Sequence, residues 1–299
     1  MRLDDYDNDI NVGEAQPGGG FGGGGGGGLL FGLLPLIGSR FGCGGIIVVL
    51  IILAVLGMNP LGLLTGGGNA PVTRSADSGQ QSARQICEAS PERREACQAF
   101  SNADNTWEKI FADSGQRFEA PGLRFFVGNS AQSGCGVAQS AVGPFYCPPD
   151  RTIYLDTRFF DELANRFGAK GDFARNYVIA HEFGHHIQTL LGTSDKVRQA
   201  QQAAGEAEGN ALSVRLELQA DCYAGVWAAK NRDRLEPGDV EEGMTAARAI
   251  GDDTLQREAT GRVVPDSFTH GSSEQRMRWL RRGMETGDPA QCDTFSGAI

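Results

Sequence analysis

The chain has 299 residues, a length that fits one or two domains. Its formal net charge of −10 argues against nucleic acid as a main partner, because phosphate backbones attract basic surfaces. Many of its 43 glycines lie before residue 70, so the N-terminal part differs in composition from the rest.

The first 40 residues do not have the composition of a folded domain. They begin with five acidic residues and continue into a glycine tract that is interrupted by Phe21. Such a segment buries too little apolar surface to offset the conformational entropy that folding removes. We therefore predict a disordered, glycine-rich tail over residues 1–40.

An apolar run without charged side chains follows at residues 41–58. In a helix with a rise of about 1.5 Å per residue, this run spans roughly 27 Å, close to the thickness of the hydrocarbon core of a bilayer. The run has no amphipathic face, which argues against the alternative of a buried core helix. We predict one transmembrane helix here, followed by a flexible linker at residues 59–85 that is rich in Gly, Ser and Gln.

Few charges bear on the orientation of the predicted transmembrane helix. Arg40 flanks its N-terminal side, whereas the nearest basic residue on the other side is Arg74. The positive-inside rule then predicts a single-pass protein of the cell membrane, with a cytoplasmic N-terminus and an extracytoplasmic domain at residues 86–299. A cleaved signal peptide fits less well, because the apolar run starts far from the N-terminus and no basic region leads into it.

Six cysteines lie outside the apolar run, and an even number on one side of a membrane indicates disulfides in an oxidising compartment. Their pairing is not fixed by the sequence. Proximity favours Cys87–Cys97 and Cys135–Cys147, which leaves Cys222–Cys292. The alternative is a set of free cytosolic thiols, and no C-x-x-C spacing indicates a metal site.

Residues 86–299 combine helical periodicity with two short extended runs, which predicts an α+β fold that is mainly helical with a small sheet. We expect strands at residues 122–127 and 152–156. The expected helices lie at residues 83–105, 158–167, 172–191, 195–206, 210–230, 238–250 and 272–283.

The motif H-E-x-x-H lies in the helix expected at residues 172–191, which Asp172 can cap and Gly192 can end. His181 and His185 are four residues apart, so both imidazoles lie on one face and can bind one metal ion. Glu182 can face a water bound to that metal and act as its general base. The alternative is a helix with two surface histidines.

Gly184, inside the motif, costs helix stability, and its presence indicates the close approach of another segment. Its alternative is simple tolerance of glycine at this position.

A catalytic zinc takes three protein ligands and leaves one position for water. Glu217 and Asp221 are four apart on the helix expected at residues 210–230 and share a face. Glu217 can be the third ligand, and Asp221 can accept a hydrogen bond from the free N–H of a ligating histidine. The alternative is a solvated acidic edge.

Two further histidines remain. His270 precedes the last expected helix and can stabilise the oxyanion of peptide hydrolysis or hydrogen-bond Glu217, or it can be a plain helix-entry residue. His186 points about 100° away from His185 and is expected to pack. We expect the solvated face of the last helix to carry Arg276, Arg278, Arg281 and Arg282.

These motifs resemble known metallopeptidases. The strings H-E-x-x-H at His181 and E-x-x-A-D at Glu217 are similar to those of gluzincins. The longer strings at residues 181–188 and 217–227, with Thr-His-Gly-Ser-Ser at residues 269–273, resemble the neutral zinc metallopeptidase family of bacteria over roughly residues 85–295. The resemblance implies a zincin-like fold, zinc bound by His181, His185 and Glu217, and Glu182 as the base.

We therefore expect a membrane-anchored zinc metalloendopeptidase whose substrate is a protein or peptide. In zincins the substrate often lies along the edge strand of the small sheet, which is an expectation from fold analogy. The alternative is an extracytoplasmic binding or scaffold protein, non-catalytic or latent, that retains the zinc site.

Overall fold

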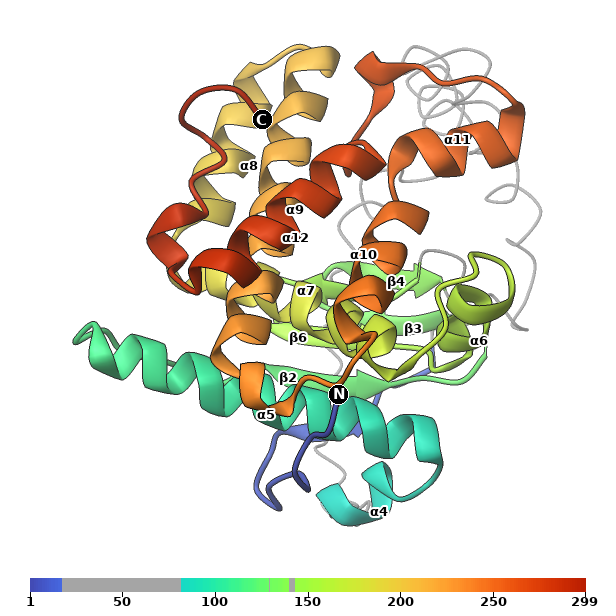
Figure 1. Ribbon diagram of the computed structural model, residues 1–299, viewed down its shortest axis with the longest axis vertical. Coiled ribbons are helices and arrows are strands. Elements are labelled where there is room, and N and C mark those ends of the chain that lie inside the picture. Colours follow the sequence, from blue (N-terminus) through green and yellow to red (C-terminus); the bar gives the residue numbers. More distant parts are fainter. Residues whose placement is uncertain (18–81, 129, 140–142) are drawn as a thin grey trace, which may run out of the picture. The chain divides into compact units, whose positions relative to one another are not determined.

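The computed structural model describes residues 1–17, 82–128, 130–139 and 143–299, and these belong to one compact unit (Figure 1). The unit is mainly helical and contains a small sheet, which confirms the expected α+β class. The described residues form six strands, nine α-helices and three short 3₁₀-helices. The larger of two apolar cores contains residues from Met1 to Cys292.

The main sheet has the strand order β1-β2-β6-β5. Strands β1 (Val12–Glu14), β2 (Gly122–Phe125) and β6 (Thr152–Leu155) are parallel, while β5 (Phe145–Cys147) is antiparallel to β6 and forms an edge. A separate hairpin is formed by β3 (Ser130–Ser133) and β4 (Gly136–Gln139). The two predicted strands are confirmed as β2 and β6, with ends one or two residues shorter than expected.

The helices follow the predicted order, with shifted ends and one addition. They are α4 (Ala83–Cys87), α5 (Pro91–Asp113), α6 (Arg158–Asn165), α7 (Asp172–Leu190), α8 (Thr193–Ala203), α9 (Glu206–Lys230), α10 (Asp239–Ala249), α11 (Asp252–Thr260) and α12 (Ser273–Thr286). The sequence pattern does not predict α11. The expected helix at residues 83–105 is divided between α4 and α5, because Ser90 caps a new helix that has Pro91 in its first turn.

Helix α7 carries the H-E-x-x-H motif through the centre of the unit, packed against α5, α9, α10 and the strands β5 and β6 (Figure 1). The expected cap by Asp172 is wrong. The helix starts after Gly171, which makes no side-chain cap, and the Asp172 carboxylate faces the N-terminal ammonium instead. Gly192 follows the helix in a left-handed conformation, as a helix-ending glycine does.

Two glycines allow the central helices to approach closely. A Cβ atom on Gly184 of α7 would lie 2.9 Å from the backbone oxygen of Ala220 in α9. A Cβ atom on Gly283 of α12 would lie 2.0 Å from the backbone oxygen of Cys222 in α9. The close approach expected at Gly184 is therefore confirmed, and it brings the motif helix against the helix that carries Glu217.

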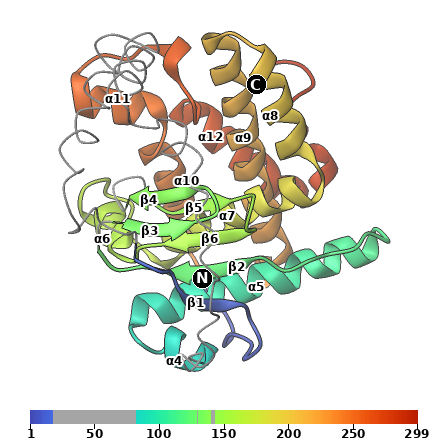
Figure 2. The same ribbon diagram turned by 180° about the vertical axis from the view of Figure 1, so that it is seen from behind.

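The first 17 residues correct the prediction of a disordered tail over residues 1–40. Residues 12–14 form β1 beside β2 (Figure 2). Met1 and Tyr6 are buried in the core. The Met1 ammonium donates to Asp172 at 2.8 and 2.9 Å and to Asp239 at 2.9 Å. Composition alone favours disorder here, but pairing with a distant strand and three charged hydrogen bonds hold this segment in place.

The predicted transmembrane helix at residues 41–58 and most of the predicted linker at residues 59–85 lie outside the described residues. Within the described ranges, no helix combines the length and apolarity needed to cross a membrane. The end of the expected linker is corrected, because α4 begins at Ala83 after the capping residue Ser82.

Three disulfides join the six cysteines in the expected pairs. The Cα–Cα distances are 6.0 Å for Cys87–Cys97, 5.8 Å for Cys135–Cys147 and 5.6 Å for Cys222–Cys292. The third links α9 to the C-terminal segment, so it holds the end of the chain against the helix that carries Glu217.

Candidate metal centre

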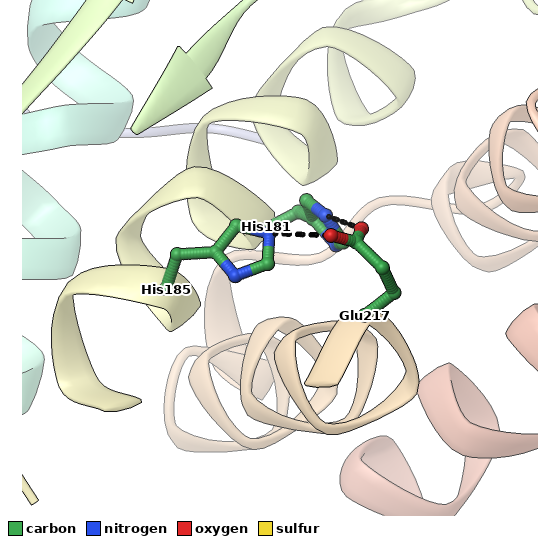
Figure 3. Close-up of side chains that lie close together, drawn as sticks. All are labelled: His181, His185 and Glu217. Atoms are coloured by element: carbon green, nitrogen blue, oxygen red, sulfur yellow. Dashed lines mark hydrogen bonds and ion pairs between the residues drawn. The ribbon is translucent and has the colours of Figure 1, made fainter. Parts of the chain in front are cut away.

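Two helices bring together three side chains that could hold a metal ion (Figure 3). His181 and His185 come from successive turns of α7, with ring centroids 4.8 Å apart and ring planes at 88°. Glu217 reaches across from α9, with its oxygens 3.2 Å from Nε2 of His181 and 3.4 Å from Nε2 of His185. One donor atom from each residue lies within 4.8 Å of the others.

The other ring nitrogen of each histidine is held by a buried acceptor. His181 Nδ1–H donates to the Asp221 carboxylate at 2.8 Å, and His185 Nδ1–H donates to the side-chain oxygen of Gln188 at 2.9 Å. These bonds orient both rings so that each Nε2 atom faces the Glu217 carboxylate. The structure thus places Asp221 against His181, where the sequence predicts it.

Asp221 is itself held by two residues of neighbouring helices. Its carboxylate accepts hydrogen bonds from the Tyr177 hydroxyl at 2.6 Å and from two nitrogens of Arg276 at 2.9 Å each. The expected position of Arg276 on a solvated face is wrong, because this side chain is only 3% exposed. A buried arginine is tolerated here because Asp221 compensates its charge.

Sequence reasoning missed Arg276 and Tyr177 as parts of this site. On α12, Arg276 lies on the same buried face as Leu280 and Gly283. Arg278, by contrast, is exposed. The spacing of Arg276 with Leu280 and Gly283 was therefore the signal that could have placed Arg276 on the buried face. For Tyr177 the signal was its position four residues before His181 on α7.

The electrostatics of the cluster favour a positive charge at its centre. Burial alone would lower the pKa of His181, but the Asp221 and Glu217 carboxylates outweigh it and raise that pKa to about 10. Burial alone would raise the pKa of Glu217, but His185 and His181 bring it well below its usual range. Burial opposes ionisation of Asp221 too, yet Arg276 and His181 lower its pKa to about 2. Two imidazoles and an ionised carboxylate form a donor set that fits zinc.

Glu182 lies beside the cluster and faces the same cleft. The cleft has a volume of ≈ 1050 Å³ and is lined by Glu182, the three donor residues and Tyr146 of the edge strand β5. Glu182 is 7% exposed, and burial is the main cause that raises the pKa of its carboxyl group. A carboxylate with a raised pKa, next to a metal-binding cluster, is suited to accept a proton.

His270 also lines the cleft, with its side chain 52% exposed. Its Nδ1 lies 3.2 Å from an Asp252 oxygen, and its backbone N–H donates to the same carboxylate at 2.6 Å. The hydrogen bond to Asp252 raises the pKa of the His270 ring. His270 is thus oriented by Asp252, and the described residues show no hydrogen bond between it and Glu217.

His186 packs away from the cluster, as expected. It is fully buried between Phe118, Phe183 and Tyr146, and it bonds to the Tyr146 hydroxyl at 3.1 Å and the Glu119 carbonyl at 2.7 Å. Burial lowers the pKa of His186 to about 4, so the ring is neutral and structural.

Comparison with known proteins agrees with this geometry. A family model with the description "Putative neutral zinc metallopeptidase" matches residues 1–295. The uncharacterized protein YpfJ of Escherichia coli strain K12 is 49% identical over 266 residues, covering 86% of this chain and 88% of that protein. The uncharacterized protein Rv2575 of Mycobacterium tuberculosis strain H37Rv is 45% identical over 212 residues, covering 66% of this chain and 69% of that protein.

No solved structure matches the chain. The family match extends over nearly the whole sequence and includes both the H-E-x-x-H helix and the helix that carries Glu217. The chain therefore belongs to the neutral zinc metallopeptidase family.

Proposed function

We propose that the protein is a zinc-dependent metalloendopeptidase that hydrolyses peptide bonds in proteins or peptides. One observation supports this above the others: two imidazole Nε2 atoms and a carboxylate converge beside the buried carboxyl group of Glu182 at the wall of a cleft. In the described part of the chain, no fourth His, Cys, Asp or Glu joins this group, and an open position is what a catalytic zinc requires.

In the proposed mechanism, His181, His185 and Glu217 hold the zinc ion. When bound, zinc lowers the pKa of a water molecule and polarises the carbonyl of the peptide bond to be cleaved. Glu182 accepts the proton of the attacking water and passes it to the leaving amine. His270, oriented by Asp252, donates a hydrogen bond to the oxygen on which negative charge develops.

The substrate is proposed to bind in an extended conformation along β5. This strand is at the edge of the sheet, and its residue Tyr146 lies beside Glu182 at the cleft. An edge strand offers unpaired backbone groups to a peptide, so this arrangement recognises the main chain.

We further propose that the protein works in an oxidising compartment, attached to the cell membrane through residues 41–58. Three disulfides in the described residues support an extracytoplasmic location. A single membrane crossing would separate residues 1–17 from residues 82–299, but both form one unit joined by the Met1 ion pairs. The proposed arrangement therefore keeps both parts on the same side of the membrane, which differs from the expected cytoplasmic N-terminus.

Substitution of Glu182 by Gln tests the catalytic proposal. We expect Glu182→Gln to retain zinc and to lose hydrolysis of a quenched fluorescent peptide mixture by about 10²–10⁴-fold, because the amide cannot accept the proton. Zinc content and circular dichroism are measured on the same samples. Full hydrolytic activity in this variant would contradict the mechanism, and a zinc-loaded wild type without any peptidase activity would favour the scaffold alternative.

A further inference from the structure

Two buried glutamines, Gln188 of α7 and Gln219 of α9, join the helices of the metal centre. Gln188 is 0% and Gln219 is 7% exposed. A buried side-chain amide is costly unless its oxygen and its NH₂ group both find partners. The partners of these two amides form one continuous chain of hydrogen bonds that starts at His185.

The direction of each hydrogen bond in this chain is set by carbonyl groups. The Gln219 NH₂ group donates to the Cys292 carbonyl at 2.9 Å, so its oxygen faces Gln188. The Gln188 NH₂ group donates to that oxygen at 3.2 Å and to the Leu216 carbonyl at 2.6 Å. The Gln188 oxygen is therefore left to accept from His185 Nδ1–H at 2.9 Å, which leaves Nε2 of His185 as an acceptor.

Gln188 also acts on the third donor residue of the cluster. Leu216 directly precedes Glu217 in α9, and its carbonyl is the one that Gln188 contacts. One side chain thus orients His185 on its own helix and holds the backbone beside Glu217 on the neighbouring helix. The Cys222–Cys292 disulfide holds the last acceptor of this series of hydrogen bonds, the Cys292 carbonyl, because it links the Cys292 segment to α9.

We propose that Gln188 is a positioning residue for both His185 and Glu217, and that Gln219 and the Cys292 carbonyl orient it. His181 is held differently, by the charged Asp221–Arg276 pair. The two histidines are thus oriented by different groups: His181 by a charged pair, and His185 by neutral side-chain amides. This inference rests on the proposed metal site, and it concerns zinc affinity rather than the chemical step.

The test measures the zinc dissociation constant of the full chain by competition with a chromophoric chelator. Gln188→Met keeps the length of the side chain but removes both the acceptor and the donor. We expect it to weaken zinc binding by about 10–100-fold, the usual effect of losing a group that supports a metal ligand. The Gln219 side chain is hydrogen-bonded to Gln188 and to the Cys292 carbonyl, not to His185 or the Leu216 carbonyl. We therefore expect Gln219→Met to weaken zinc binding less than Gln188→Met does.

Asn231→Leu is the matched control. Asn231 is a buried amide at the end of the same helix α9, bonded to Asn102 and Thr106, and about 20 Å along the helix from Glu217. This variant loses stability without losing zinc affinity if the proposal is correct. Free energies of unfolding in urea, measured for all variants, separate destabilisation from a specific effect on the metal.

The outcomes distinguish this inference from the proposed function. A folded Gln188→Met variant that binds zinc as tightly as the wild type overturns the role of Gln188. If Gln188→Met does not fold, the zinc affinity of Gln219→Met is the deciding measurement. A zinc affinity equal to that of the wild type in Gln219→Met overturns the proposed role of the two glutamines. A folded wild type that binds no zinc overturns the proposed function, and this inference with it.

Discussion

At the scale of single residues, the centre of the molecule is a set of charges that balance one another. Asp221 lies between His181 and Arg276, with all three buried, and Tyr177 completes the hydrogen bonds of the carboxylate. Removing one partner of such a set leaves the other charge buried without compensation. The set therefore links the stability of the fold to the orientation of the His181 imidazole, one of the three candidate zinc ligands.

Arg276→Met tests this coupling. Because Asp221 would keep a buried charge without its partner, we expect the free energy of unfolding to fall by about 3–5 kcal/mol in urea denaturation. Arg278→Met serves as the control, since Arg278 is exposed on the same helix. If the two variants have equal free energies of unfolding, the Asp221–Arg276 pair does not contribute the predicted stability.

The sequence predicted the candidate metal ligands better than it predicted the residues that orient them. H-E-x-x-H carries its own geometry, because a spacing of four places His181 and His185 on one helix face. Glu217 and Asp221 follow from the same rule on a second helix. Arg276 was missed because four arginines in one helix indicate a solvated face, and only packing of α12 against α9 shows which of them is buried.

At the scale of elements, the N-terminal segment is bonded to the start of α7, the helix that carries H-E-x-x-H. The Met1 ammonium lies between Asp172, in the first turn of α7, and Asp239, in the first turn of α10. Strand β1 adds the outer edge of the sheet, and Glu14 at its end pairs with Arg93 of α5. This strand was missed because three residues, Val-Gly-Glu, carry no alternating pattern and their partner strand lies more than one hundred residues away.

Asp239→Asn tests the contribution of this ion pair. Burial lowers the pKa of the Met1 amino group, but Asp172 and Asp239 raise it above its ordinary value of 8.0. A raised pKa of a cation contributes stability that is present below pH 8.0 and is lost as the pH rises through the folded-state value. We expect the variant to be less stable than the wild type at pH 7 and to lose less stability between pH 7 and pH 10.

Thermal unfolding at a series of pH values checks this expectation, with the exposed Asp233→Asn as the control. A wild type whose stability does not change above pH 8, or an Asp239→Asn variant with the same decline, would contradict the role assigned to the ammonium.

At the scale of the whole molecule, one folded unit contains both the first residues and the long C-terminal part. Six of the seven cysteines are paired within that unit. The predicted class, the order of most helices and the disulfide pairs could be taken from local patterns and spacing. That residues 1–17 belong to the same folded unit could not be predicted, because their place depends on pairing with a distant strand and their short acidic sequence has no clear strand pattern.

Labelling of single introduced cysteines tests the proposed placement of both parts on one side of the membrane. Asn8 and Ser296 are exposed, so Asn8→Cys and Ser296→Cys are accessible to a maleimide that does not cross membranes. We expect both to react in cells whose outer barrier is opened and whose cytoplasmic membrane is intact. Reaction at only one of the two positions would contradict this placement.

The most direct test of the account is the zinc content of the full-length protein beside Glu217→Ala. The full chain is required, because a shorter protein starting in the predicted linker would lack Met1 and β1. The account predicts one zinc ion per wild-type chain and its loss or strong weakening in the variant, since Glu217 is one of three donors at the cluster. A folded wild type that takes up no zinc after reconstitution, or a Glu217→Ala variant that binds it equally well, would contradict the three-residue metal centre.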